Sequence, residues 1–372
     1  MKKNIVAAVH FFWTAPLFVC SLFAFGVKDN GIQNTRTVVD QIGDTVVLPQ
    51  NVERVVIASV WPLASVYCLA FGTDSIVGLD PAIISAAENS MLIKKYPDLS
   101  NKPSSFSKNG VLNVEELITL KPDVVLYSSG IMADRDAART AGIPAVGFSL
   151  DVKDFNAVET INSWVSLLGE VMGKDIRDNN YIAYGNKIQE LVASRVKNIP
   201  ENEKPLCMFI HRYTETGVGI PGLKTWADYW ITASGGRNAA ASVSGTPTVT
   251  MEQIYQWNPQ KIYITNFNDA LPYDLYNSTF HAFDFSTVDA IKNKAVCKVP
   301  LGMYRWYVTC SDSPMMLLWM AKQNQPEVFA DIDLNAYMRE FYQTFYGMNL
   351  SDAELNMIYN PVREASGGIK NK

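Results

Sequence analysis

Two stretches of the chain repeat one pattern: NVEELITLKPDVVL at residues 113–126 and TMEQIYQWNPQKIY at residues 250–263. Each stretch begins with a residue that favours a helix N-cap and has Glu or Gln three positions later, which predicts a capping box. A short helix is then expected, which a proline ends before an apolar run resumes as a strand. Because the second copy follows after a large part of the chain, the repeat predicts two similar α/β lobes rather than a solenoid.

The predicted capping boxes pair Asn113 with Glu116 and Thr250 with Gln253. They leave one carboxylate of each copy uncommitted, Glu115 in the first and Glu252 in the second. An acidic residue in the first turn of any helix is also favoured by the helix dipole, by about 0.3–1 kcal/mol. Position alone therefore assigns these two residues no function.

The rest of the 372-residue chain fits the same division. Strand patterns alternate with helical patterns, which is typical of parallel sheets with helices on both faces. We expect an N-terminal lobe at residues 27–150 and a C-terminal lobe at residues 201–372. Residues 151–200 show helical periodicity without a strand. After Gly173 they predict a continuous helix of about 24 residues, about 36 Å long, which would join the lobes rigidly.

Other local signals place further elements. Residues 37–48 alternate around Gly43 and predict a hairpin. The segment that follows the strand at residues 76–79 is rich in Ser, Asn and Lys, so a loop is expected up to Gly110. Three helical segments are expected to close the chain, at residues 314–323, 335–346 and 352–359.

The N-terminus reads as an export signal over residues 1–26. Lys2 and Lys3 precede an apolar stretch, and small residues precede Val27. A single membrane anchor is the alternative, because the apolar stretch approaches spanning length. Lipid attachment at Cys20 is a third reading, although Val19 is bulky for the position before a lipidated cysteine. In each case the chain is expected to be exported, to the periplasm or the cell envelope.

Composition excludes several functions. A net charge of −5 without a basic stripe argues against a nucleic-acid partner. The chain has no Gly-x-Ser-x-Gly elbow, P-loop, His-Glu-x-x-His motif or Rossmann glycine fingerprint, and only three histidines, so we expect neither an enzyme nor a bound cofactor. No Cys-x-x-Cys pair supports a structural zinc. Buried free thiols are expected at Cys68 and Cys207, whereas a disulfide between Cys297 and Cys310 stays open.

The order of several short motifs resembles the ABC-importer solute-binding proteins for ferric siderophores, haem, cobalamin and related metal chelates. These motifs are Val38-Val39-Asp40, Leu48-Pro49, Asn113-Val114-Glu115, Leu120-Lys121-Pro122-Asp123, Gly142-Ile143-Pro144, Ala233-Ser234-Gly235-Gly236-Arg237-Asn238, Met251-Glu252-Gln253-Ile254 and Asn258-Pro259. The resemblance implies two α/β lobes of Rossmann-like type, a single long interlobe helix and a ligand cleft between the lobes. It also implies that Glu115 and Glu252 dock onto arginines of a dimeric membrane permease. A monomer that needs no catalysis is expected.

Ligands of open α/β sheets bind beyond the carboxyl ends of the strands, which selects the residues that follow each predicted strand. The candidates are Trp61, Tyr127-Ser128-Ser129, His211-Arg212-Tyr213 and Asn266-Phe267, and less securely Trp226 and Arg305-Trp306-Tyr307. Arginine forks match carboxylate and catecholate oxygens, and aromatic rings suit a flat conjugated ligand. The alternative is that the polar residues are ordinary strand ends and the aromatic residues belong to the core.

The sequence therefore favours an exported binding protein that captures an iron or other metal chelate, such as a siderophore, haem or a corrinoid, and delivers it to an ABC permease. A surface scavenger or sensor with the same fold, and a two-lobed α/β enzyme, are the alternatives. Bare metal ions are disfavoured, because no clustered set of His and carboxylate ligands is evident. The identity of the chelate stays open.

Overall fold

The computed structural model describes residues 34–174, 180–214, 217–279 and 283–366. The predicted export signal and Cys20 lie outside the described residues. Two four-stranded parallel sheets form, in the orders β4-β3-β7-β8 and β12-β9-β14-β15. Each order reads second, first, third and fourth strand along its own half of the chain. The two halves of the chain thus share one sheet topology, and the sequence repeat lies at matching positions of the two sheets. This confirms the predicted α/β class.

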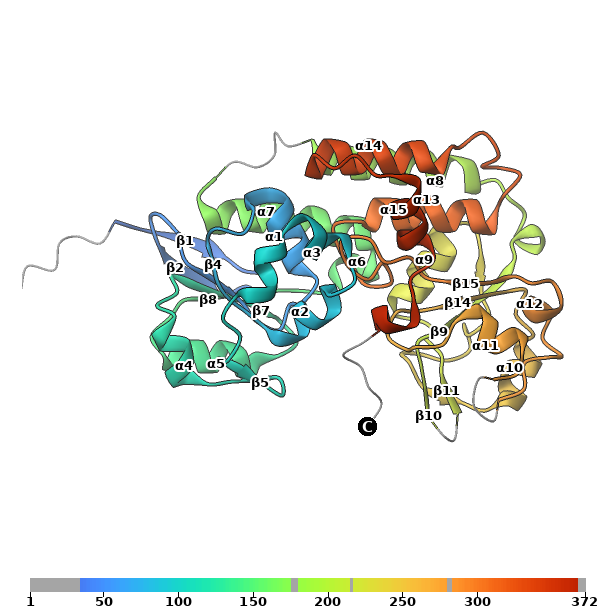
Figure 1. Cartoon of the computed structure of the whole chain (residues 1–372), viewed down its shortest axis with the longest axis horizontal. Helices are drawn as coiled ribbons and strands as arrows, with labels where there is room; N and C mark the ends of the chain where they lie inside the picture. The colour runs from blue at the N-terminus through green and yellow to red at the C-terminus, as the bar shows by residue number, and fades with distance from the viewer. Residues whose placement is uncertain (1–33, 175–179, 215–216, 280–282, 367–372) are drawn as a thin grey trace, which may run out of the picture. The chain divides into compact units, whose positions relative to one another are not determined.

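The first sheet has helices on both faces (Figure 1). Its strands are β3 (Val55–Ile57), β4 (Ile76–Leu79), β7 (Val124–Ser128) and β8 (Ala145–Phe148). Successive side chains of a strand point to opposite faces. Val55 and Ile57 join the core under α1 (Leu63–Phe71) and α7 (Ala157–Met172). Val56 joins a separate core under α4 (Val114–Thr119) and α5 (Met132–Thr140).

The second sheet repeats this arrangement. Its strands are β9 (Leu206–Ile210), β12 (Arg237–Asn238), β14 (Lys261–Ile264) and β15 (Val296–Lys298). One face contributes Phe209 to the core with α9 (Trp226–Ala233) and α13 (Ser313–Asn324). The other contributes Ile210 to a core with α10 (Met251–Trp257), α11 (Pro272–Tyr276) and α12 (Asp289–Lys292). Strand β14 follows α10 as β7 follows α4.

The smaller elements include confirmed and wrong predictions. The hairpin is present as β1 (Thr35–Val39) and β2 (Thr45–Pro49), and the closing helices as α13, α14 (Leu334–Tyr346) and α15 (Asp352–Tyr359). The prediction of a loop up to Gly110 was wrong, because this segment contains α2 (Pro81–Ala87), α3 (Met91–Lys95) and the short strand β5 (Ser107–Lys108). Strand β5 pairs with β6 (Val111–Leu112), which follows directly. Asp80 and Ser90 cap the two helices, accepting hydrogen bonds from Ala82 N and Leu92 N at 2.8 and 3.2 Å.

In the described part of the segment between the two sheets, the long helices are two of sixteen residues each, rather than one helix of about 24 residues. The first, α7, ends at Gly173, whose φ of 62° stops the helix in the left-handed conformation. The second, α8 (Tyr181–Val196), begins after Asn180, which is also left-handed at φ 59°. Helix α7 packs on α1, and α8 packs on α13. The link therefore consists of two helices that pack on each other, and α7 also contacts α13 of the C-terminal half.

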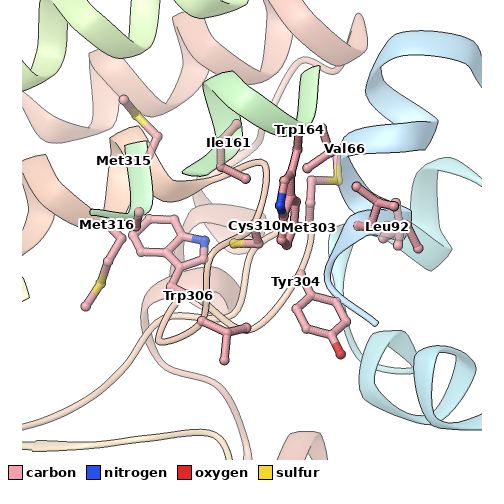
Figure 2. Packing of buried hydrophobic residues seen from close by; sticks show 14 of the residues in the cluster. Val66, Leu92, Ile161, Trp164, Met303, Tyr304, Trp306, Cys310, Met315 and Met316 are labelled. Carbon is pink, nitrogen blue, oxygen red and sulfur yellow. The ribbon is translucent and has the colours of Figure 1, made fainter. Parts of the chain in front are cut away.

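One hydrophobic core extends through both halves (Figure 2). Trp164 of α7 and Val66 of α1 belong to the same buried cluster as Met303, Trp306 and Met315 from the C-terminal half. Backbone hydrogen bonds cross the same boundary, from Met91 N to Gly302 O at 2.9 Å and from Ser311 N to Ser65 Oγ at 3.1 Å. The segment of residues 300–312 is buried throughout. It fills the space between the helices of the two halves.

Candidate functional site

Five side chains meet near the carboxyl ends of the second sheet. His211 follows β9, Phe267 follows β14, Arg305 and Tyr307 lie in the segment after β15, and Trp226 begins α9. We call these five residues the strand-end cluster. The strand order reverses between β9 and β14, which is where open α/β sheets bind their ligands.

The side chains of the strand-end cluster form a continuous series of contacts in space. The His211 centroid lies 5.1 Å from that of Phe267 and 5.2 Å from that of Tyr307, tilted by 37° and 38°. Trp226 meets Tyr307 edge-on, at 6.2 Å between centroids. The Arg305 guanidinium lies over the Phe267 ring at 5.0 Å. A cation and a neutral imidazole are thus set among three aromatic faces, an arrangement that suits an anionic ligand with flat apolar surface.

The electrostatics of the cluster favour a neutral histidine. Burial, and then the nearby Arg212 charge, lower the pKa of His211 to about 4, so the imidazole is uncharged at neutral pH. Among the described residues, His211 Nδ1 and Trp226 Nε1 are buried and have no hydrogen-bond partner. Buried polar atoms without a partner cost free energy, and a ligand that bonds to them would remove that cost. Arg305 is buried, which lowers its pKa, yet a guanidinium stays charged in proteins.

Two buried ionisable groups hold the loops of the cluster. The Lys298 ammonium donates to the carbonyl oxygens of Thr265, Asn268 and Ala270 at 3.0, 2.7 and 2.8 Å, which fixes the loop around Phe267. The Asp312 carboxylate accepts hydrogen bonds from Met303 N at 2.5 Å and Tyr304 N at 3.3 Å, and from Tyr342 Oη at 3.2 Å. It thereby fixes the segment that carries Arg305 and Tyr307. Burial lowers the pKa of Lys298 to about 7 and raises that of Asp312 to about 6.

A further aromatic residue next to the cluster, Phe155, was not predicted. Its ring meets Trp226 edge-on, at 6.2 Å and 89°. Lys153, Asp154 and Phe155 have consecutive φ values of 48°, 56° and 65°, so α6 (Val152–Phe155) is a left-handed turn. Side chains at such angles cost about 1–2 kcal/mol each. The segment contains no glycine, so no local signal of the sequence indicates this turn.

Two predicted residues lie in the core instead of the cluster. Tyr127 is inside β7 and belongs to the core under α4 and α5, on the face of the first sheet opposite to α1 and α7. Trp306 is fully buried with Met303 and Met315 in the core that both halves share (Figure 2). Its neighbours in sequence, Arg305 and Tyr307, belong to the strand-end cluster. The structure thus separates Trp306 from its two neighbours, and a ligand-binding role for these three residues stays a prediction.

Three other predicted residues lie apart from the cluster's ring contacts. Arg212 and Tyr213 belong to β10 (Arg212–Thr214), which pairs with β11 (Gly217–Gly219) and, through it, β13 (Thr248–Val249) in an antiparallel sheet that the sequence did not predict. Arg212 is exposed and donates to Thr246 O at 3.4 Å. The Tyr213 hydroxyl donates to the Asp269 carboxylate. Trp61 is partly exposed just before α1, and its carbonyl accepts from Ala64 N.

The two repeat carboxylates, Glu115 and Glu252, are exposed on α4 and α10. Neither forms an ion pair within the part of the chain that the structure describes. The capping boxes are only partly present. Asn113 Oδ1 accepts from Glu116 N at 3.0 Å, but the Glu116 carboxylate accepts from the Ser105 hydroxyl instead of closing the box.

The prediction of a second capping box, between Thr250 and Gln253, was wrong. Thr250 makes no side-chain cap bond to its helix, and the Gln253 amide donates to Gln256 Oε1 at 3.1 Å. A hydrogen bond with the Thr250 side chain instead lowers the pKa of Glu252. Glu252 therefore stays ionised at neutral pH and exposed to solvent.

The described residues contain no group of three or more His, Cys, Asp or Glu placed to hold a metal ion. Cys68, Cys207, Cys297 and Cys310 are free thiols, so the disulfide that the sequence left open is not formed. Across the same residues, every helix is too short or too polar to cross a membrane.

Comparisons with known proteins agree with this fold. The family described as "Periplasmic binding protein" matches residues 64–299. The molybdate-binding protein MolA of Haemophilus influenzae is 24% identical over 335 residues, which cover 84% of this chain and 91% of MolA. A periplasmic solute-binding protein from Veillonella parvula superposes with a TM-score of 0.78 at 30% identity, covering 88% of this chain and 97% of that one. CeuE of Helicobacter pylori, solved as a nickel–histidine complex, superposes with a TM-score of 0.68 at 23% identity, covering 87% and 98%.

The matched region runs from α1 to the end of β15, so it includes the strands of both sheets after β3 and the helix pair between them. It also contains the carboxyl ends of β9 and β14, where His211 and Phe267 lie. With a family match over more than half of its length, the chain belongs to the periplasmic binding protein family.

Proposed function

We propose that this chain is the exported solute-binding component of an ABC import system and that the strand-end cluster captures its cargo. The observation that carries the proposal is the convergence of Arg305, neutral His211 and three aromatic rings at the switch point of the second sheet. Such a site binds and orients a solute and needs no catalytic group.

The favoured cargo is an anionic metal chelate with flat or conjugated groups, such as a siderophore, haem or a corrinoid. The Arg305 guanidinium would pair with its carboxylate or catecholate oxygens. The rings of Trp226, Phe267 and Tyr307 would stack on its flat surface. Because the described residues form no cluster of metal ligands, we expect the metal to arrive already coordinated. CeuE, which superposes on this chain, was solved as a nickel–histidine complex.

A second candidate cargo is a small oxyanion. It is favoured by the similarity to MolA, whose name gives molybdate, over most of both chains. Arg305 and the unpartnered ring nitrogens of His211 and Trp226 could donate to oxyanion oxygens. A tetrahedral oxyanion would leave most of the aromatic surface unused, which is why we rank it second.

Delivery is proposed to occur through Glu115 and Glu252, each meeting an arginine on one half of a dimeric permease, with the binding protein acting as a monomer. Charge pairs at an interface rim guide and orient the partner more than they add affinity. Charge reversal of both residues should abolish uptake while the affinity for cargo stays the same. A scavenger or sensor with this fold would show no dependence on a permease. Mass spectrometry of the mature N-terminus would distinguish cleavage before Val27 from lipid attachment at Cys20.

The test of cargo is direct. Protein exported by its native host is purified and examined by visible absorption and native mass spectrometry. The apoprotein is then titrated by calorimetry with a ferric siderophore, haemin, cobalamin, nickel–histidine and molybdate. We expect micromolar or tighter binding of one chelate. Binding of molybdate alone would select the second candidate, and binding of none of the five would refute the assignment of this cluster.

A further inference from the structure

Each of the two proposed docking carboxylates has an exposed apolar neighbour on its own helix. Ile118 follows Glu115 by three positions and is 49% exposed, and Tyr255 follows Glu252 by three positions and is 39% exposed. Residues three apart on a helix lie on the same face. Both short helices therefore present one carboxylate and one apolar side chain side by side to solvent.

The rotation of both helices is fixed by the same internal contact. Leu117 and Ile254, which precede the two exposed apolar residues, are fully buried in the cores of their lobes. The Tyr255 hydroxyl donates to Asp284 O at 2.6 Å, which restrains its side chain. Because matching positions of the repeat are buried and matching positions are exposed, the two outward faces are equivalent in register.

A single exposed apolar residue is ordinary on a protein surface and indicates nothing by itself. Here the exposure recurs at the same register of both lobes and next to the same carboxylate. A partner with two equivalent halves accounts for that recurrence. A second copy of this chain does not, because it would place carboxylates against carboxylates, and like charges across an interface oppose association.

Resting on the proposed docking function, we propose that Ile118 and Tyr255 are the apolar anchors of the permease interface. Each enters an apolar site on one half of the permease, beside the basic group that pairs with Glu115 or Glu252. The carboxylates and the apolar anchors then have different effects on the rates of binding. Exposed charges speed and orient the encounter, whereas desolvated apolar anchors slow dissociation.

The experiment measures binding of the full exported chain to the cognate permease–ATPase complex in lipid nanodiscs, by biolayer interferometry at low and high salt. The variants are Ile118→Gln, Tyr255→Gln, Glu115→Lys and Glu252→Lys. Met357→Gln is the matched control, because Met357 is a helical apolar residue that is 54% exposed elsewhere. Thermal unfolding by circular dichroism verifies that each variant is folded.

We expect each anchor variant to dissociate about tenfold faster, with an unchanged association rate and salt dependence. The Glu variants should associate more slowly and lose salt dependence, while Met357→Gln behaves as wild type. Tyr255→Phe, which keeps the ring, should retain binding. If the Glu variants weaken docking and the anchor variants do not, this inference is overturned and the proposed function stands. If the Met357 control weakens docking equally, the anchors are not specific. If no variant changes binding, the docking mode itself is refuted along with the anchors.

Discussion

Arg305→Ala is the substitution that tests the site most directly. Arg305 is a buried cation of the strand-end cluster, and its guanidinium lies 5.0 Å over Phe267. An anionic chelate bound at the ends of β9 and β14 would have this guanidinium as its counter-charge. We expect the alanine variant to lose most of the affinity while the cluster's aromatic walls stay in place.

The magnitude follows from the kind of bond that is lost. A hydrogen bond to a charged group contributes about 1.5–3 kcal/mol, which corresponds to about a 10- to 150-fold loss of affinity. The contact with Phe267 contributes about 0.5–2 kcal/mol more, but to folding rather than to binding, since it exists without ligand. Arg305→Lys keeps the charge and loses the planar fork, so its loss should be intermediate.

The assay is calorimetric titration of the apoprotein with the chelate that the cargo test identifies, and urea unfolding reports the folding term separately. Arg212→Ala provides the contrast. Arg212 is exposed on the β10 hairpin and bonded to Thr246 O, so we expect an affinity change below about threefold. If Arg212→Ala costs more affinity than Arg305→Ala, or if folded Arg305→Ala binds as wild type, the placement of the cargo at the strand-end cluster is wrong.

Three further variants test the buried charges and the strained turn by urea unfolding. The pKa of His211 is about 4 in the folded protein, against a usual value near 6.5. The protein should therefore lose up to about 3 kcal/mol of stability as the pH falls from 6.5 to 4, because the folded state resists protonation of this buried ring. His211→Gln should remove this pH dependence. Asp312 should change the stability in the opposite direction, because its pKa in the folded protein, about 6, exceeds the usual 3.8. Ionisation of this buried carboxyl costs about 3 kcal/mol of stability above pH 6, so the protein should become more stable as the pH falls from 7 to 4. Asp312→Asn should abolish this rise. Lys153→Gly should stabilise the protein by about 0.5–1 kcal/mol, since glycine adopts the left-handed conformation without strain; a loss of stability would show that the turn is not strained.

The parts of the fold that the sequence predicted rest on local signals. Two N-cap positions, two prolines and the apolar runs after them were enough to predict α4–β7 and α10–β14 as equivalent units. Helices α2 and α3 were missed because elements of seven and five residues are too short to show a helical period. The start of α8 after Asn180, whose φ is 59°, was missed because the helical periodicity of the sequence continues without a glycine or proline at this point.

The site was predictable where topology alone places residues. His211 and Phe267 follow two central strands of a parallel sheet, so a rule about strand ends selects both. The rule does not say which side chains of a buried loop join the cluster, and Trp306 was therefore selected together with Arg305 and Tyr307, although all three are buried. Phe155 could not be predicted, because three consecutive left-handed residues without glycine are unfavourable until the fold imposes them.

The shared core explains why the link between the lobes need not be one rod. Trp164, Val66 and Leu92 from the N-terminal half are fully buried against Met303 and Trp306 from the C-terminal half (Figure 2). A large hinge rotation would separate these side chains, and each aliphatic or aromatic chain exposed costs about 1.5–3 kcal/mol. Exposing all five would cost about 7.5–15 kcal/mol, which is comparable to the whole stability of an ordinary domain, about 5–15 kcal/mol. The expected restriction to small interlobe motion therefore follows from continuous packing between the halves, and a divided pair of helices is sufficient to connect them.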